Sequence, residues 1–82
     1  MKPRKQQQSW KVLKAFKPLR ASSADRLDVR IVEDGGSRYV DIRQYLVSAT
    51  YEGYTQKGVR LTDEQWESLV GQATAISKLL IK

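Results

Sequence analysis

Two runs of alternating residues, joined by an Asp-Gly-Gly step, limit the folds open to this chain more than any other feature. Apolar side chains recur at every second position in residues 26–33 and again in residues 38–47. A period of two is typical of a β-strand with one covered face, and the paired glycines supply the positive φ angles of a tight hairpin. The sequence therefore predicts an antiparallel strand pair. One face should carry Leu27, Val29, Ile31, Val40 and Ile42, and the other Asp28, Arg30, Val32, Tyr39, Asp41 and Arg43.

A further short strand is predicted to run directly into a helix. Val59 and Leu61 alternate with Arg60, and Thr62 then stands three residues before Gln65. This is the spacing of a capping box, in which each side chain accepts a hydrogen bond from the other residue's backbone amide. The apolar residues that follow recur at the three- and four-residue intervals of one helix face. They are Trp66, Leu69, Val70, Ala73, Ile76 and Leu80.

The remaining segments complete a four-stranded plan. Residues 10–17 alternate imperfectly and are predicted to form a first strand, with a short helix as the alternative, and Pro18 either ends this segment or limits it to an edge strand. Residues 48–58 are predicted to be a loop with two tyrosines, and residues 1–9 a disordered basic arm. The predicted fold is an α+β domain over residues 10–82, in which a four-stranded antiparallel sheet precedes one C-terminal α-helix.

The small size of the chain favours association. Among its 82 residues there is neither Cys nor His, so disulfides and the common zinc sites cannot stabilise it. Pairing of two copies is the remaining means, and a homodimer is predicted. Gly71, in the middle of the predicted helix, is either an exposed, tolerated glycine or a point of close approach to another helix.

Positive charge is concentrated at the N-terminus. The formal net charge is +6, and the first 20 residues contain seven basic groups and no acidic group. Such an arm is typical of proteins that meet a polyanion, although it can also be a solvated tail. Without His, Cys or a phosphate-binding glycine loop, neither an enzyme nor a bound cofactor or metal is expected.

The location of the protein follows from what its sequence does not contain. No apolar run is long enough to span a membrane, and no secretory signal is recognised. The expected location is the cytoplasm, in association with the nucleoid, for a bacterial or phage protein, and the nucleus for a eukaryotic one.

Two ordered motifs resemble a known family. Tyr-Val-Asp-Ile-Arg-Gln-Tyr, residues 39–45, is followed after eleven residues by Lys-Gly-Val-Arg-Leu-Thr-Asp-Glu-Gln-Trp-Glu-Ser-Leu, residues 57–69. Over about residues 27–76 the chain resembles the C-terminal domain of the transcriptional coactivator positive cofactor four. The resemblance implies a homodimer in which each chain gives a curved four-stranded sheet and a helix at the two-fold axis. It also implies binding of single-stranded DNA or unpaired duplex regions, largely without sequence preference. The long first hairpin is similar to the bacterial and phage branch, which contains stand-alone single-strand binders.

The resemblance carries over to a limited set of residues. Arg30 and Arg43 match strand positions that contact the DNA backbone, and Lys57 matches a lysine before a tight glycine turn. Val32 and Leu46 stand where the family has stacking aromatics, so stacking is expected from tyrosines instead. The predicted nucleic-acid-binding residues are Arg30, Arg43, Lys57, Arg60, Tyr45, Tyr51, Tyr54, Lys11, Lys17 and Arg38. The predicted dimer interface consists of Trp66, Leu69, Val70, Ala73 and Ile76.

Arginines on neighbouring strands have two interpretations. They can bind phosphate and stack on bases, or Arg30 and Arg43 can pair with Asp28, Asp41 or Glu33 across the sheet and only keep it soluble. The family resemblance favours the first interpretation.

Other assignments leave further alternatives. Trp10 and Trp66 are expected in the core, and Tyr39 in cross-strand packing. Lys11 and Lys17 should share one face, with Lys14 on the other. RNA stays open as a ligand. A second class of function is a protein-interaction module that docks an acidic partner, such as a polymerase or recombination protein.

Overall fold

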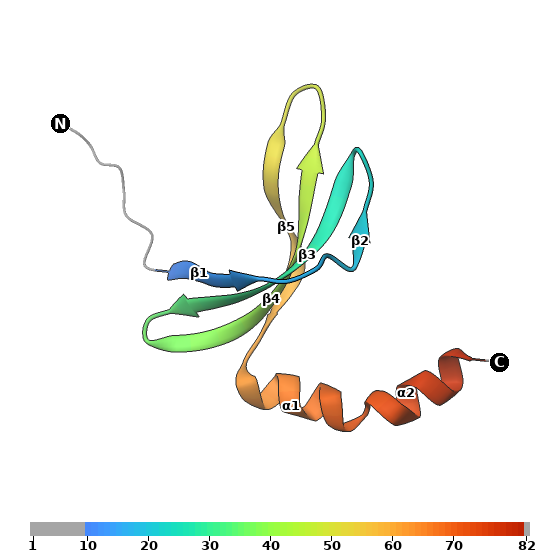
Figure 1. Ribbon diagram of the computed structural model, residues 1–82. Helices are drawn as coiled ribbons and strands as arrows, with labels where there is room; N and C mark the ends of the chain where they lie inside the picture. Colours follow the sequence, from blue (N-terminus) through green and yellow to red (C-terminus); the bar gives the residue numbers. More distant parts are fainter. Residues whose placement is uncertain (1–9, 82) are drawn as a thin grey trace.

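The computed structural model describes residues 10–81, which form an antiparallel sheet followed by two short helices (Figure 1). Its strands hydrogen-bond in the order β1-β3-β4-β5, with the two-residue β2 beside β3. The predicted α+β plan is confirmed, and the predicted arm, residues 1–9, lies outside the described residues. The elements are β1 (Trp10–Ala15), β2 (Arg20–Ala21), β3 (Asp25–Asp34), β4 (Ser37–Val47), β5 (Glu52–Leu61), α1 (Asp63–Gly71) and α2 (Ala73–Leu80).

The central hairpin has the two faces that the alternation predicts. Gly35 and Gly36 form its turn with φ angles of 61° and 85°. The register of β3 and β4 places Arg30 opposite Asp41. Because successive residues of a strand point to opposite faces of the sheet, the two strands place their alternate residues on the same two faces. β5 continues this pattern, with Arg60 opposite Asp41. The apolar face consists of Leu27, Val29, Ile31, Val40, Ile42, Val59 and Leu61.

β5 is much longer than predicted. The sequence predicts a loop over residues 48–58, but the structure confines the turn to residues 48–51 and continues the strand from Glu52 to Leu61. Tyr54 lies opposite Tyr45, and their ring centroids are 4.8 Å apart in an edge-to-face arrangement. An aromatic pair of this kind stabilises neighbouring strands, so a segment rich in polar residues and glycine is held in the sheet.

Gly58 lies inside β5, and the prediction of a turn there is wrong. The register between β4 and β5 shifts at Gln44 of β4, which stands opposite residues 55–57 of β5. This extra length makes a bulge in β5, and Lys57 is part of it. A Cβ atom at Gly58 would lie 2.2 Å from the carbonyl oxygen of Ile42. Glycine is therefore required because the two backbones approach closely.

The junction between strand and helix is as predicted. β5 ends at Leu61 and α1 begins at Asp63. The amide of Gln65 donates to the hydroxyl of Thr62 at 3.1 Å, and the amide of Thr62 donates to the side chain of Gln65 at 2.9 Å. The single predicted helix is instead two, because the backbone at Gln72 (φ −100°, ψ 0°) leaves the helical conformation.

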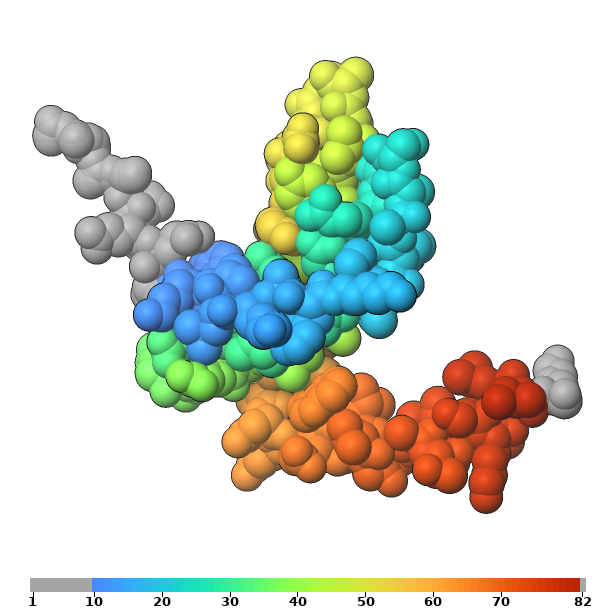
Figure 2. Space-filling model, in the orientation of Figure 1, coloured from blue at the N-terminus to red at the C-terminus, as the bar shows by residue number. Residues whose placement is uncertain are grey.

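The described part of one chain buries little apolar surface. Within residues 10–81, Val32 and Val40 are the buried apolar side chains, and no residue of α1 or α2 is buried. The helices extend away from the sheet as a separate arm (Figures 1 and 2). The radius of gyration is 15.8 Å, whereas a compact chain of this size has about 11–12 Å. One chain alone is therefore open rather than compact.

An open apolar groove of about 620 Å³ lies beside the apolar face. Trp66 of α1 lines it together with Val29, Ile31 and Val40, and Phe16 extends it toward the end of β1. Trp66, predicted to be a core residue over the sheet, thus faces apolar side chains but stays 38% exposed. Neither helix in residues 10–81 has the length and apolar character needed to cross a bilayer.

Candidate functional site

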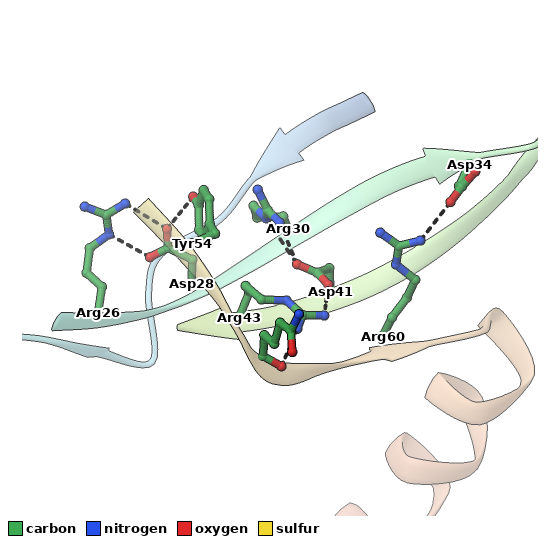
Figure 3. A network of polar contacts seen from close by, with 9 residues as sticks. Arg26, Asp28, Arg30, Asp34, Asp41, Arg43, Tyr54 and Arg60 are labelled. Atoms are coloured by element: carbon green, nitrogen blue, oxygen red, sulfur yellow. Dashed lines mark hydrogen bonds and ion pairs between the residues drawn. The ribbon is translucent and has the colours of Figure 1, made fainter. Parts of the chain in front are cut away.

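The opposite side of the sheet gathers charged and aromatic side chains, and Figure 3 shows those of β3, β4 and β5 that form its polar contacts. Alternation along each strand places every second residue on this side, and the register of the strands brings these residues together. Trp10 joins them because β1 pairs it with Asp34 at the end of β3. The polar face is defined here as Trp10, Arg26, Asp28, Arg30, Asp34, Tyr39, Asp41, Arg43, Tyr45, Tyr54 and Arg60.

Asp41 holds the centre of the polar face. It accepts hydrogen bonds from Arg30 at 2.7 Å and from Arg43 at 2.9 Å, and Arg43 also donates to the carbonyl oxygen of Gln56 at 3.0 Å. Asp41 is 1% exposed and Arg30 5%. Burial opposes ionisation of Asp41, but the bonds from Arg43 and Arg30 outweigh it and keep the pKa of Asp41 below its usual range. The centre is therefore an ionised, closely bonded group of two arginines and one carboxylate.

Asp28 organises the end of the polar face near the β4–β5 turn. Arg26 donates two hydrogen bonds to its carboxylate, at 2.8 and 2.9 Å, and the hydroxyl of Tyr54 donates a third at 2.7 Å. The bonds from Arg26 lower the pKa of Asp28. Burial raises the pKa of Tyr54, and the bond to Asp28 raises it further. Arg26 also lies 4.2 Å from the ring centroid of Tyr45, so this end combines a cation with two rings.

Arginines and aromatic rings alternate across the rest of the polar face. The guanidinium of Arg30 lies 4.0 Å from the ring centroid of Tyr54 and 5.8 Å from that of Trp10. The guanidinium of Arg60 lies 5.6 Å from the ring centroid of Trp10 and 5.5 Å from that of Tyr39. The same guanidinium forms an ion pair with the carboxylate of Asp34 on β3 at 2.9 Å. These separations are within the range of cation–π attraction, so one series of stacked groups crosses the sheet.

Arg30 and Arg43 form the contacts that the solubility interpretation predicts. Both pair with Asp41 across or along the sheet. A phosphate would reach either guanidinium only by displacing or sharing this carboxylate. The side chain of Arg43 is 19% exposed and that of Arg30 only 7%, so Arg43 is the more accessible of the two.

The cations of β1 lie on the opposite side of the sheet. A register shift between Val12 and Lys14 places Lys11 opposite Glu33 and Lys14 opposite Ile31. These two lysines therefore share the side of the apolar face, and the prediction that Lys14 lies apart from Lys11 is wrong. Lys17 lines the apolar groove.

Two predicted binding residues near the central hairpin turn share one carboxylate. Lys11 lies 3.8 Å and Arg38 3.5 Å from Glu33. The side chains of both cations are about 70% exposed, so these pairs lie in solvent and hold neither cation firmly.

Lys57 and two tyrosines are the accessible predicted residues on and beside β5. Lys57 is exposed and forms no ion pair with another residue of the described range 10–81. Tyr51 and Tyr54 are 46% and 37% exposed, and the hydroxyl of Tyr51 donates to the carbonyl oxygen of Tyr54. The predicted dimer residues are exposed as well: Trp66, Leu69, Val70, Ala73 and Ile76.

Trp10, Arg26 and Asp34 are the residues of the polar face that the sequence did not indicate. Trp10 is predicted to be a core residue, yet it lies partly exposed beside Arg30 and Arg60. Its face depends on the register between β1 and β3, which the irregular alternation of residues 10–17 does not reveal. Asp28 and Asp41 alternate correctly in the sequence, but only the strand pairing shows which arginines they hold.

Comparison with known proteins identifies relatives of this arrangement. The model of a family described as transcriptional coactivator p15 (PC4) matches residues 22–72, more than half of the chain. Two crystal forms, tetragonal and orthorhombic, of a PC4 homolog from Burkholderia pseudomallei K96243 are similar to the structure, each with a TM-score of 0.62 and 22% identity. The similarity covers 78% of this chain and 96% and 88% of the two bacterial chains. None of the curated proteins matches the chain.

Proposed function

Because the chain belongs to the transcriptional coactivator p15 (PC4) family, we propose that it is a non-enzymatic homodimer that binds single-stranded DNA with little sequence preference in transcription, replication or repair. The polar face is the observation that carries this proposal. Proteins that bind single strands combine cations that follow the phosphates with rings on which bases stack. The polar face joins four arginines to four aromatic residues on one surface.

Charge on the polar face favours an anionic ligand. Its four arginines outnumber its three aspartates, and the exposed Lys57 adds a positive charge next to Gly58, which lies opposite Arg43. In this proposal the buried residues Arg30 and Asp41 stabilise the sheet and the positions of its aromatic rings. The first contacts with phosphate are made by the solvent-accessible residues Lys57, Arg43 and Arg60.

A second copy of the chain is the proposed cover for the helices. Leu69, Val70 and Ile76 are 41%, 47% and 41% exposed, and burying the part of each that is still exposed gains roughly 0.6–1.4 kcal/mol. Pairing of the α1–α2 arms of two copies would bury them and give the open chain a larger core.

Sedimentation equilibrium tests the dimer. The parent should sediment as a dimer, and Leu69→Arg should dissociate it because a buried guanidinium without a partner is costly. Glu67→Arg is the matched control, since it places the same side chain at another exposed position of α1. A folded, monomeric parent would show that the proposed dimer is wrong.

Fluorescence anisotropy with a labelled oligonucleotide of about 20 nucleotides tests DNA binding. Affinity for the single strand should fall with salt, at a slope of about −0.7 per phosphate neutralised. Lys57→Ala should weaken binding and reduce the size of this slope by about 0.7. Lys78→Ala on α2 is the matched control, because Lys78 is an exposed cation away from the polar face.

The outcome separates the candidate functions. Equal effects of the two lysine substitutions would mean that net charge, and not the polar face, determines affinity. Absence of binding to single-stranded DNA, to duplex and to RNA would instead support a protein-interaction module that docks an acidic partner.

A further inference from the structure

We infer that Trp10 stacks on a base at the outer end of the polar face, so that a bound single strand runs from Tyr45 and Tyr54 at one end to Trp10 at the other. This inference rests on the proposed function and names a ligand contact that the sequence did not indicate. It concerns β1, an edge strand outside the segment that the family model matches.

The position of Trp10 favours a ligand contact over a core role. It begins the edge strand β1, lies opposite Asp34, and is partly exposed. The ring contacts recorded for it are with the guanidinium groups of Arg30 and Arg60, at 5.8 and 5.6 Å. The register also places Val12 and the buried Val32 on this side of the sheet, so the ring borders apolar side chains at its inner edge and lies near two cations at its outer edge.

The neighbouring arginine suits a stacked nucleotide. The side chain of Arg60 is 32% exposed and is tied to Asp34 at 2.9 Å, so its guanidinium is fixed next to the ring. A base on Trp10 would bring its own phosphate close to this cation. A ring and a cation side by side are the two elements that a single strand requires.

The length of the polar face sets the size of the strand. Arg26 lies opposite Tyr45 and Asp34 lies opposite Trp10, and these two positions are eight residues apart on β3. At about 3.3 Å per residue the path is about 26 Å long. A strand with the base-stacked duplex spacing of about 3.4 Å per nucleotide covers this path with about eight nucleotides, and a more extended strand covers it with fewer.

Tryptophan fluorescence tests the inference with the full chain. The protein has two tryptophans, and Trp10→Phe leaves only Trp66, which lines the apolar groove on the other side of the sheet. Oligothymidylates of 4 and 12 nucleotides are titrated into the parent and into Trp10→Phe, and binding is followed independently by anisotropy of labelled oligonucleotides.

The expected result has three parts. The longer oligonucleotide quenches the emission of the parent and leaves that of Trp10→Phe unchanged. Trp10→Ala, checked for folding by circular dichroism, lowers affinity for 12 nucleotides by roughly 5- to 150-fold, the range for loss of one base–aromatic stack. Trp10→Phe keeps most of that affinity because it retains a ring, and 4 nucleotides bind the parent far more weakly than 12.

Two results would overturn the inference, and they differ from failure of the proposed function. If anisotropy shows binding while the parent emission stays constant, the strand does not reach Trp10. If the parent and a folded Trp10→Ala bind 12 nucleotides equally well, the ring contributes nothing. If neither oligonucleotide binds the parent at all, the proposed function fails, and the inference fails with it.

Discussion

Replacement of Asp41 by Asn removes the charge that holds the centre of the polar face, and it should destabilise the protein strongly. The side chains of Asp41 and Arg30 are 1% and 7% exposed, so the substitution leaves a guanidinium buried without its anion. Loss of one partner from a buried pair costs about 3–5 kcal/mol. The guanidinium of Arg43 can be hydrated in place of its lost ion pair, because 19% of this side chain is exposed, and the Asn side chain keeps one hydrogen-bond acceptor. We therefore expect a loss at the lower end of this range, about 3 kcal/mol. For a domain of this size that corresponds to a decrease in Tm of roughly 12–24 °C.

Urea unfolding followed by far-ultraviolet circular dichroism measures this loss. All variants must be compared at one protomer concentration, because the free energy of unfolding of the proposed dimer would depend on it. The matched control is Glu33→Gln, which removes a carboxylate from two cations whose side chains are about 70% exposed. It should cost less than about 1 kcal/mol. Equal losses for Asp41→Asn and Glu33→Gln would refute the conclusion that burial makes the central group important.

Two further predictions use thermal unfolding. Gly58→Ala should lower the free energy of unfolding by at least about 1–3 kcal/mol, because φ is 154° and the new Cβ would meet the carbonyl oxygen of Ile42. Gly71→Ala is the control, because no atom lies within 4 Å of the added Cβ. It should be neutral or stabilise the helix by up to about 1 kcal/mol. A larger loss of stability for Gly71→Ala than for Gly58→Ala would contradict the bulge geometry. Stability should also fall as pH drops below about 4. The pKa values of Asp28 and Asp41 are lowered in the folded protein, so the unfolded chain takes up these protons first; Asp41→Asn should flatten the pH profile, and an unchanged profile would contradict this cause.

Local patterns were sufficient for the elements that depend on neighbouring residues. The alternation around Gly35 and Gly36 predicted the central hairpin and both of its faces. The capping box of Thr62 and Gln65 predicted the helix start to the residue. In both cases the physical cause, a side-chain period or a pair of hydrogen bonds, acts within a few positions of the chain.

The predicted loop over residues 48–58 shows where local patterns stop. Its polar residues and glycines carry little strand propensity, and the pairing of Tyr54 with Tyr45 of another strand holds it in the sheet. The predicted single helix also ends earlier than expected, at Gly71, where the chain bends before α2. Neither outcome is encoded by the period of the residues themselves.

By itself, the sequence determined which residues alternate, where the helix starts and that cations are plentiful. Only the tertiary structure decided that Arg30 and Arg43 share Asp41, and that Trp10 lies among arginines. The reason is register: the pairing of β3 with β4 places Arg30 opposite Asp41, and the pairing of β1 with β3, shifted by the bulge in β1, places Trp10 opposite Asp34. A side chain's partner across a sheet depends on this register, and no period along one strand records it.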